Sequence, residues 1–140
     1  MPSLLFIDDE PEGLEWALSI LRTSLPDATI DIAETVEESI EMLNEKQYTL
    51  VVMDIFIPMG INARQTLGPR ARQYQEHMRH LGGLAILDFV ERMPKKPRIL
   101  AHTACTDYAL IEILGDVVHD RIPKPAPVDI LLKEIQRALE

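Results

Sequence analysis

Five short apolar runs recur along this chain of 140 residues. They are Leu4–Ile7, Ala28–Ala33, Leu50–Met53, Arg98–His102 and Val117–Ile122. Each has about the four to seven residues of a strand in a parallel sheet, and Val, Ile and Leu dominate them, which is typical of strands buried on both faces. The second run alternates apolar with polar residues, which predicts a strand nearer the edge of the sheet.

Segments with helical spacing separate these runs. Their apolar residues recur three or four positions apart: Leu14, Leu18, Leu21 and Leu25; Val36, Ile40 and Leu43; Leu84, Leu87 and Val90; Leu110, Ile113 and Leu114; Leu131, Ile135 and Leu139. Thr35 caps the second helix, and Gly115 stops the fourth. The alternation predicts an α/β fold, in which helices wrap a doubly wound, five-stranded parallel sheet. Right-handed crossovers then bring the carboxyl ends of all strands to one edge, where ligands bind.

Composition places the chain among ordinary soluble domains. Hydrophobic residues make up 46% of it and charged residues 26%, and the length indicates one domain spanning residues 1–140. No apolar run approaches the ~20 residues of a membrane span, and the opening MPSLLFIDDE lacks the basic and apolar regions of a secretory signal. The single cysteine, Cys105, forms no internal disulfide. A cytoplasmic location is therefore expected.

The charge is acidic overall but unevenly distributed. A net charge of −9 repels phosphate backbones, so direct nucleic-acid binding is not expected. Residues 59–82, called here the 59–82 segment, hold four arginines and one glutamate, a net +3 that leaves −12 for the remainder. This segment interrupts the strand–helix rhythm, and its apolar residues are too sparse for a buried face. It predicts an exposed insertion of 24 residues between the third strand and the third helix, either a loop or a loosely docked helix.

Chemically distinctive side chains follow the ends of the predicted strands. Asp8 and Asp9 close the first strand, Asp54 the third and Thr103 the fourth, and Lys124 follows the fifth. Carboxylates packed this closely repel one another unless a cation lies among them, and an all-oxygen ligand set suits Mg²⁺. A carboxylate beside Mg²⁺ can attack a phosphoryl group to form an aspartyl phosphate. An ammonium and a hydroxyl are then suitable donors to the phosphoryl oxygens.

Four motifs carry a resemblance to a known family. FIDDE at 6–10, MDIFIP at 53–58, HTA at 102–104 and IPKP at 122–125 resemble, in order and in place, those of response-regulator receiver domains, the CheY-like family of two-component signalling. The resemblance covers essentially the whole chain except the 59–82 segment. It implies a flavodoxin-like sheet of strand order 2-1-3-4-5, and a signalling phosphoacceptor that promotes only its own phosphorylation and dephosphorylation, not an enzyme with a separate substrate.

The resemblance also assigns roles by position. Asp54 resembles the aspartate that accepts the phosphoryl group. Asp8 and Asp9 resemble the acidic pair that holds Mg²⁺, together with Asp54 and the backbone carbonyl of Phe56. Thr103 resembles the switch hydroxyl that meets the phosphoryl group. Lys124 resembles the lysine that binds a phosphoryl oxygen, and its bond to the following proline is typically cis in the family.

Partners follow from the same resemblance. A histidine kinase or a histidine phosphotransfer protein would supply the phosphoryl group. The face formed by the helix around 110–114, the strand at 117–122 and the C-terminal helix is the family's usual contact surface for a downstream protein, and the 59–82 segment adds a second candidate. A homodimer is possible on this resemblance. No membrane or nucleic-acid contact is implied.

The sequence departs from the family pattern in three respects. Arg121 stands three positions before Lys124, where the family usually has an aromatic switch residue, so a weakened or altered switch is expected. Phe56 and Cys105 each lie two positions past a site residue and position water poorly, which predicts slow self-dephosphorylation. The 59–82 segment is the third departure.

Two other functions are compatible with parts of the pattern. A phosphorylation-independent binding scaffold on a receiver fold would use Arg121 and the basic 59–82 segment. A phosphohydrolase of the haloacid-dehalogenase type also forms an aspartyl phosphate, but its DxD motif ends the first strand. Here the acids at that place are adjacent, and the candidate nucleophile follows the third strand.

Overall fold

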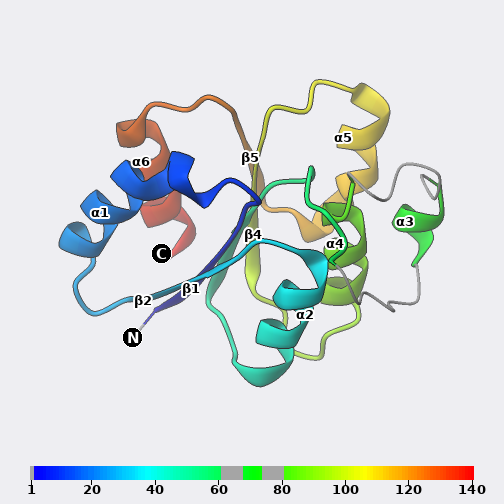
Figure 1. The fold of residues 1–140 in the computed structure, drawn as a ribbon, viewed down its shortest axis with the longest axis horizontal. Helices are drawn as coiled ribbons and strands as arrows, with labels where there is room; N and C mark the ends of the chain where they lie inside the picture. The colour runs from blue at the N-terminus through cyan, green and yellow to red at the C-terminus, as the bar shows by residue number, and fades with distance from the viewer. Residues whose placement is uncertain (1, 61–67, 74–80) are drawn as a thin grey trace.

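The computed structural model describes residues 2–60, 68–73 and 81–140. Its strands form one parallel sheet in the order β2-β1-β3-β4-β5. Figure 1 shows helices on both sides of this sheet. The strands are β1 (Ser3–Ile7), β2 (Thr29–Ala33), β3 (Leu50–Met53), β4 (Arg98–Thr103) and β5 (Asp120–Pro123). The predicted α/β class, strand order and edge position of the second strand are confirmed.

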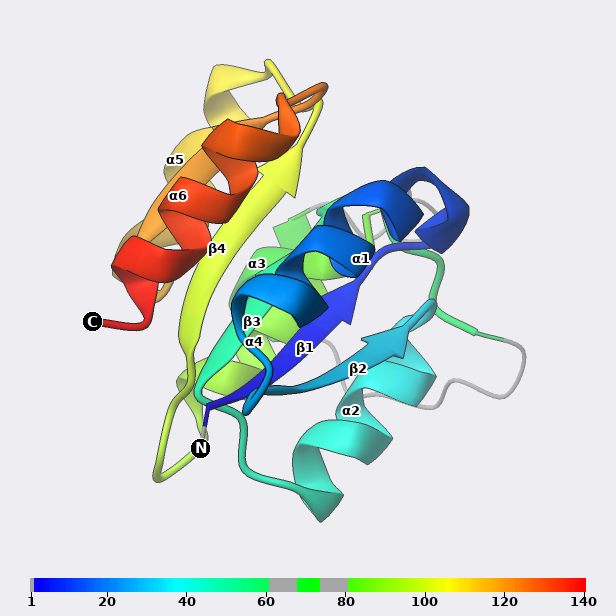
Figure 2. The same ribbon diagram turned by 90° about the vertical axis from the view of Figure 1, so that its left-hand side faces the viewer.

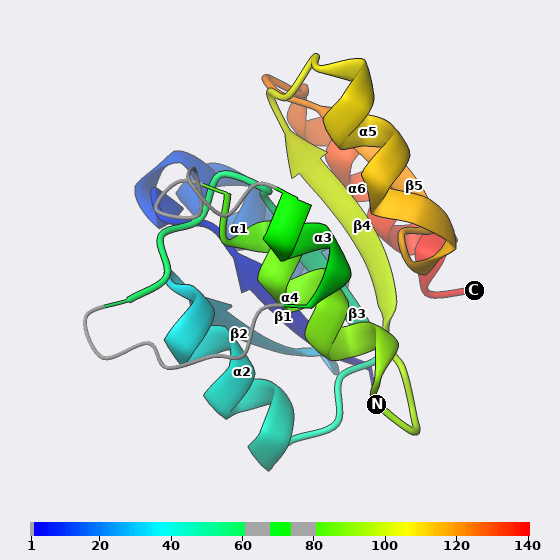
Figure 3. The same cartoon turned by 90° about the vertical axis from the view of Figure 1, so that its right-hand side faces the viewer.

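Helices cover both faces of this sheet. They are the 3₁₀ turn η1 (Pro11–Leu14), α1 (Glu15–Ser24), α2 (Val36–Glu45), α3 (Pro69–Gln73), α4 (Gly83–Glu91), α5 (Tyr108–Leu114), the 3₁₀ turn η3 (Gly115–Val117) and α6 (Val128–Ala138). Figure 2 shows α1 and α6 side by side over one face, and Figure 3 shows α2, α4 and α5 over the other, with α3 outside α4. In the described part of the chain, no helix has the length and apolar character that crossing a membrane demands.

Two apolar cores follow from the alternation of side chains along each strand. On β1, Leu4 and Phe6 pack with α1 and α6, whereas Leu5 and Ile7 pack with α2 and α4. All four side chains are at most 1% exposed. Burial on both faces explains why the central strands read as continuous apolar runs, and it fixes the register that places the strand ends.

Local signals in the sequence operate as expected. The Thr35 hydroxyl accepts a hydrogen bond from the Glu38 amide at 3.1 Å and caps α2. Gly115 ends α5 with a φ of +64°, a conformation that favours glycine. The Lys124–Pro125 bond is cis, in agreement with the resemblance.

The predicted fifth strand was placed too early. The apolar run Val117–Ile122 was expected to be a strand buried on both faces, but residues Gly115–Val117 form a 3₁₀ turn and β5 begins at Asp120. Only Ile122 of β5 is buried, because β5 is an edge strand. Pattern alone could not separate apolar residues covered by helices from those in the strand itself.

Part of the 59–82 segment is a docked helix, one of the two forms expected for it, but the prediction that the segment is exposed was wrong for that part. Helix α3 packs on α4, Ala71 is wholly buried and Leu81 is 7% exposed. Polar contacts to Asp88 of α4 supply what the sparse apolar residues lack. Of the charged residues and histidines in this segment, the structure describes Arg70 and Arg72, both on α3. The others lie outside the described residues: Arg64, Glu76, His77, Arg79 and His80.

Candidate functional site

The carboxyl ends of β1, β3 and β5 bring together side chains far apart in the sequence. Each of these residues extends its strand by one backbone hydrogen bond: Asp8 to the Ala33 carbonyl, Asp54 to the Ile7 carbonyl and Lys124 to the Thr103 carbonyl, all at 3.0 Å. The sheet therefore fixes where these three side chains start, and its register makes them converge.

Lys124 lies between the two buried carboxylates. Its Nζ donates to Asp8 Oδ2 at 2.7 Å and to Asp54 Oδ2 at 2.9 Å. The Asp8 and Asp54 side chains are 4% and 8% exposed, whereas that of Lys124 is 24% exposed. Burial by itself lowers the pKa of Lys124, but the hydrogen bonds to Asp8 and Asp54 outweigh it and raise that pKa. The ammonium therefore stays charged and balances part of the acidic cluster.

Backbone amides orient the remaining carboxylate oxygens. The Glu10 N–H donates to Asp8 Oδ1 at 2.9 Å, and the Phe56 N–H donates to Asp54 Oδ1 at 3.1 Å. In each case the donor lies two residues after the acid, the local pattern that aspartate favours in turns. The two carboxylates are thus each held by an amide on one oxygen and by the shared ammonium on the other.

Asp9 adds a third, exposed carboxylate to the same edge. Partial burial and the neighbouring charge of Asp8 raise the pKa of Asp9, and the charge of Asp54 adds to this effect. Three carboxylates face one ammonium here, so the local charge is negative and favours a cation.

The donor chemistry fits Mg²⁺ coordinated partly by water. Among the described residues, no three His, Cys, Asp or Glu side chains are grouped as a ready-made metal site. Magnesium, however, retains several waters and is usually held by one or two carboxylates together with a substrate phosphate. Asp8, Asp9 and Asp54 supply carboxylates of the required kind at one edge, so the residues present fit this ion.

Thr103 and His102, at the end of β4, belong to opposite faces of the sheet. Thr103 is 1% exposed, and its Oγ1 accepts a hydrogen bond from the Cys105 amide at 3.3 Å. Because side chains alternate along a strand, Thr103 lies on the α4 and α5 side and His102 on the α1 and α6 side. Burial, followed by the charge of Lys124, lowers the pKa of His102.

His102 also lines a cavity of about 290 Å³ between α1 and α6. Asp8 and Lys124 line the same cavity, as do Ala17 of α1 and Leu131 of α6. His102 is part of the HTA motif, but its orientation toward a cavity depends on the helices that cover it.

The other noted residues lie around this edge. Phe56 is 38% exposed, Cys105 is buried at 6% exposure, and Arg121 is exposed on β5. A charged side chain on an edge strand remains in water, so Arg121 does not provide the buried ring that the family usually has at this position.

Solved structures resemble this architecture over nearly its whole length. The response regulator TrrA of Thermotoga maritima, solved in complex with Mg²⁺ and BeF, is 24% identical with a TM-score of 0.70, and the alignment covers 99% of this chain and 100% of that one. The chain has the receiver fold. A CheY-like receiver domain of Methanospirillum hungatei is 18% identical with a TM-score of 0.75, covering 99% and 94% of the two chains.

A third similar structure is the signal receiver domain of a two-component histidine kinase from Clostridium thermocellum. It is 17% identical with a TM-score of 0.73, covering 99% of this chain and 98% of that one. No protein-family model and no curated protein sequence matches this chain. The resemblance to receiver domains therefore rests on the fold and on the four sequence motifs.

Proposed function

We propose that the chain is a receiver domain, with the 59–82 segment as an insertion within it, and that Asp54 accepts a phosphoryl group from a histidine kinase or histidine phosphotransfer protein. The observation that carries this proposal is the pair of buried carboxylates, Asp8 and Asp54, bridged by Lys124 at 2.7 and 2.9 Å. The complex of a similar receiver-fold protein with Mg²⁺ and BeF supports it.

In the proposed reaction an oxygen of Asp54 attacks the phosphorus of a phosphohistidine. A P–O bond forms, the P–N bond breaks, and the imidazole leaves with the bonding electron pair and takes up a proton. The Phe56 amide keeps the carboxylate oriented, and the Lys124 ammonium stabilises negative charge on the phosphoryl oxygens. When bound, Mg²⁺ supplies further charge neutralisation, and Asp8, Asp9, Asp54 and the Phe56 carbonyl would hold it.

Phosphorylation would act as a switch through Thr103. A phosphoryl group adds about −1.5 to −2 charges to this edge. The Thr103 hydroxyl, at the end of β4 and next to the connection to α5, would respond to that charge. The output is a shift between two conformations that changes the affinity for a downstream protein. The domain therefore acts as a signalling protein whose only chemistry is its own phosphorylation and dephosphorylation, in the cytoplasm where two-component phosphorelays operate.

We further propose that the phosphorylated state is long-lived. Phe56 is an apolar, partly exposed side chain beside Asp54, and buried Cys105 follows Thr103 without a strong hydrogen-bonding group. Neither positions an attacking water well. Decay of the phosphorylated protein over minutes to hours is expected, and decay within seconds would contradict this.

A binding scaffold independent of phosphorylation is the second candidate. The specific observation in its favour is the exposed Arg121 on β5, where the family usually has its aromatic switch residue. Such a scaffold would bind its partner equally well with and without a phosphoryl analogue.

Intact-protein mass spectrometry tests the first proposal. The chain is incubated with Mg²⁺ and acetyl phosphate or a phosphorylated histidine phosphotransfer domain, and one added phosphoryl group is expected in wild type. Asp54→Asn should abolish it, whereas Asp27→Asn, which alters an exposed aspartate, should not. Equal labelling of the Asp54→Asn variant, or none in wild type with either donor, would refute the assignment.

A further inference from the structure

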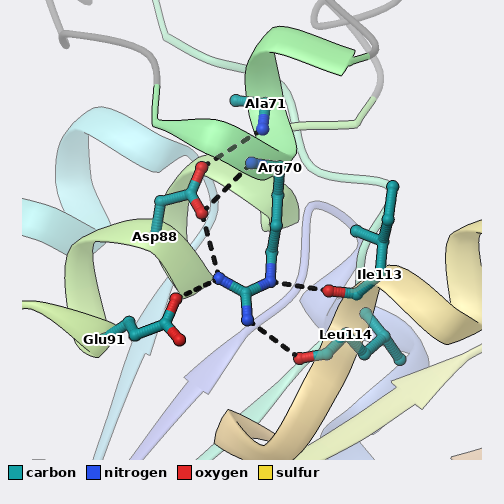
Figure 4. Close-up of polar contacts among 6 residues, drawn as sticks. All are labelled: Arg70, Ala71, Asp88, Glu91, Ile113 and Leu114. Carbon is teal, nitrogen blue, oxygen red and sulfur yellow. Dashed lines mark hydrogen bonds and ion pairs between the residues drawn. The ribbon is translucent and has the colours of Figure 1, made fainter.

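An arginine on α3 connects three helices. The Arg70 guanidinium donates from Nε to the Ile113 carbonyl at 2.6 Å and from Nη2 to the Leu114 carbonyl at 3.4 Å, both in the last turn of α5 (Figure 4). Its Nη1 donates to Asp88 Oδ1 of α4 at 3.1 Å and also bonds Glu91. A single side chain thus joins α3, α4 and the C-terminal end of α5.

Asp88 anchors α3 at the other side of this connection. Its side chain is 2% exposed, and it accepts hydrogen bonds from the backbone amides of Arg70 at 3.4 Å and Ala71 at 3.1 Å as well as from the guanidinium. Ala71 is wholly buried beside it. The backbone of α3 is therefore fixed on α4, and the Arg70 side chain projects from a fixed base toward α5.

Two glycines leave the room that this arrangement needs. A Cβ on Gly68 would lie 2.6 Å from three atoms of the Asp88 side chain, a distance that forces them apart. Gly115, which ends α5 with a φ of +64°, would bring a Cβ to 3.0 Å from Arg70 Nη2. A side chain at either position would disturb the contacts of Arg70 and Asp88. Glycine at both positions leaves these contacts room to form.

Within the described residues, helix α5 has few other attachments. Only Leu110 and Leu114 of its seven residues are buried, and Tyr108 is 83% exposed. Its N-terminal cap is local, because the Asp107 carboxylate accepts from the Ala109 amide at 2.9 Å. A short connection joins α5 to Thr103 at the candidate site. One end of α5 therefore follows the site, and the other is held by Arg70.

We propose that α3 is a conformational strap, in which Arg70 holds the C-terminal end of α5 against α4 and opposes displacement of α5 when the site is phosphorylated. The part of this proposal that concerns phosphorylation rests on the proposed function. The part that concerns the restraint of α5 by Arg70 does not. A ligand shifts a conformational equilibrium only by its differential affinity for the two states. Hydrogen bonds that hold one state therefore weaken the apparent affinity of a ligand that favours the other.

Amide hydrogen exchange tests the restraint without any ligand. Arg70→Gln removes the guanidinium, and Arg72→Gln is the matched control on the same short helix, since Arg72 is exposed. The amides of α5 should exchange about tenfold faster in Arg70→Gln than in wild type, because several charge-assisted hydrogen bonds are lost. Their exchange rates should be unchanged in Arg72→Gln. The strap would be overturned if the α5 amides of Arg70→Gln exchange at the wild-type rate, or if the amides of β1 and β3 are accelerated equally.

Binding of beryllofluoride with Mg²⁺, a phosphoryl analogue, tests the opposition. Arg70→Gln should bind it about three- to tenfold more tightly than wild type, and Arg72→Gln should match wild type. Equal affinity of all three proteins would overturn the proposed opposition. If Arg70→Gln does not fold, Glu91→Gln removes only the exposed partner of Arg70 and should shift both measurements in the same direction by less.

The two proposals fail in different ways. Absence of beryllofluoride binding to wild type and to every variant refutes the proposed phosphoacceptor function. The α5 exchange comparison then still decides whether Arg70 restrains the helix, because that measurement contains no phosphoryl analogue.

Discussion

Replacing Lys124 by Met tests the electrostatic design of the candidate site. The substitution keeps most of the side chain's length and removes the ammonium that lies 2.7 Å from Asp8 and 2.9 Å from Asp54. Two carboxylates with less than one-tenth of their side-chain surface exposed then face each other without a counter-charge. The folded state should lose stability at neutral pH in the absence of divalent cations.

The expected loss of folding stability follows from the burial of the two carboxylates. Removing one partner of a buried ion pair costs about 3–5 kcal/mol, because the remaining charge is left unpaired. Lys124 is 24% exposed, so water enters to solvate the carboxylates in part, and about 2–4 kcal/mol is expected. For a chain of this length that corresponds to a fall in Tm of about 7–14 °C. Mg²⁺ should recover part of the loss, since a second cation can take over the neutralisation.

Urea unfolding of wild type and Lys124→Met, each with EDTA and with Mg²⁺, measures both effects. Asp8→Asn combined with Lys124→Met should be less destabilised than the two single variants predict together, because their sites are in direct contact. Lys133→Met is the matched control on the outside of α6. A Lys124→Met variant within ~0.5 kcal/mol of wild type, the range of ordinary surface substitutions, would show that the ammonium does not balance buried charge.

Three further outcomes follow from the same geometry. The pKa of Lys124 is raised in the folded state, so the stability that this ammonium contributes is complete below the ordinary pKa of 10.5 and is lost as pH rises through the higher folded pKa. Above pH 10.5, the free energy of unfolding of wild type should therefore fall more steeply than that of Lys124→Met. Asp9→Asn removes a carboxylate whose pKa is raised, so it should leave metal-free Tm unchanged or higher while reducing the Tm gain on adding Mg²⁺; an undiminished gain would exclude Asp9 as a ligand. Gly115→Ala should cost about 1–3 kcal/mol in urea unfolding, because Gly115 has a φ of +64° and a ψ of −163°, a region essentially restricted to glycine; a neutral effect would contradict that backbone conformation.

Much of the fold could be predicted because local and global signals agree. The run Leu50–Met53 became β3 with the same bounds, since a central parallel strand is buried on both faces and therefore reads as continuously apolar. The edge position of β2 followed from its alternation. The start of β5 was predicted wrongly because β5 is also an edge strand. It has few buried residues, and the apolar residues before it lie outside the strand.

The sequence alone also placed Asp8, Asp54 and Lys124 at strand ends on one edge, because the carboxyl ends of parallel strands lie at the same edge of a sheet. Only the tertiary structure decided that Lys124 bridges both carboxylates, that His102 faces a cavity on the opposite side from Thr103, and that part of the 59–82 segment is docked. The periodicity of a strand is a pattern among neighbouring residues, so it can be read from the sequence. The Arg70 and Asp88 contacts join residues 17 or more positions apart through single polar groups, which leave no periodic signal in the sequence.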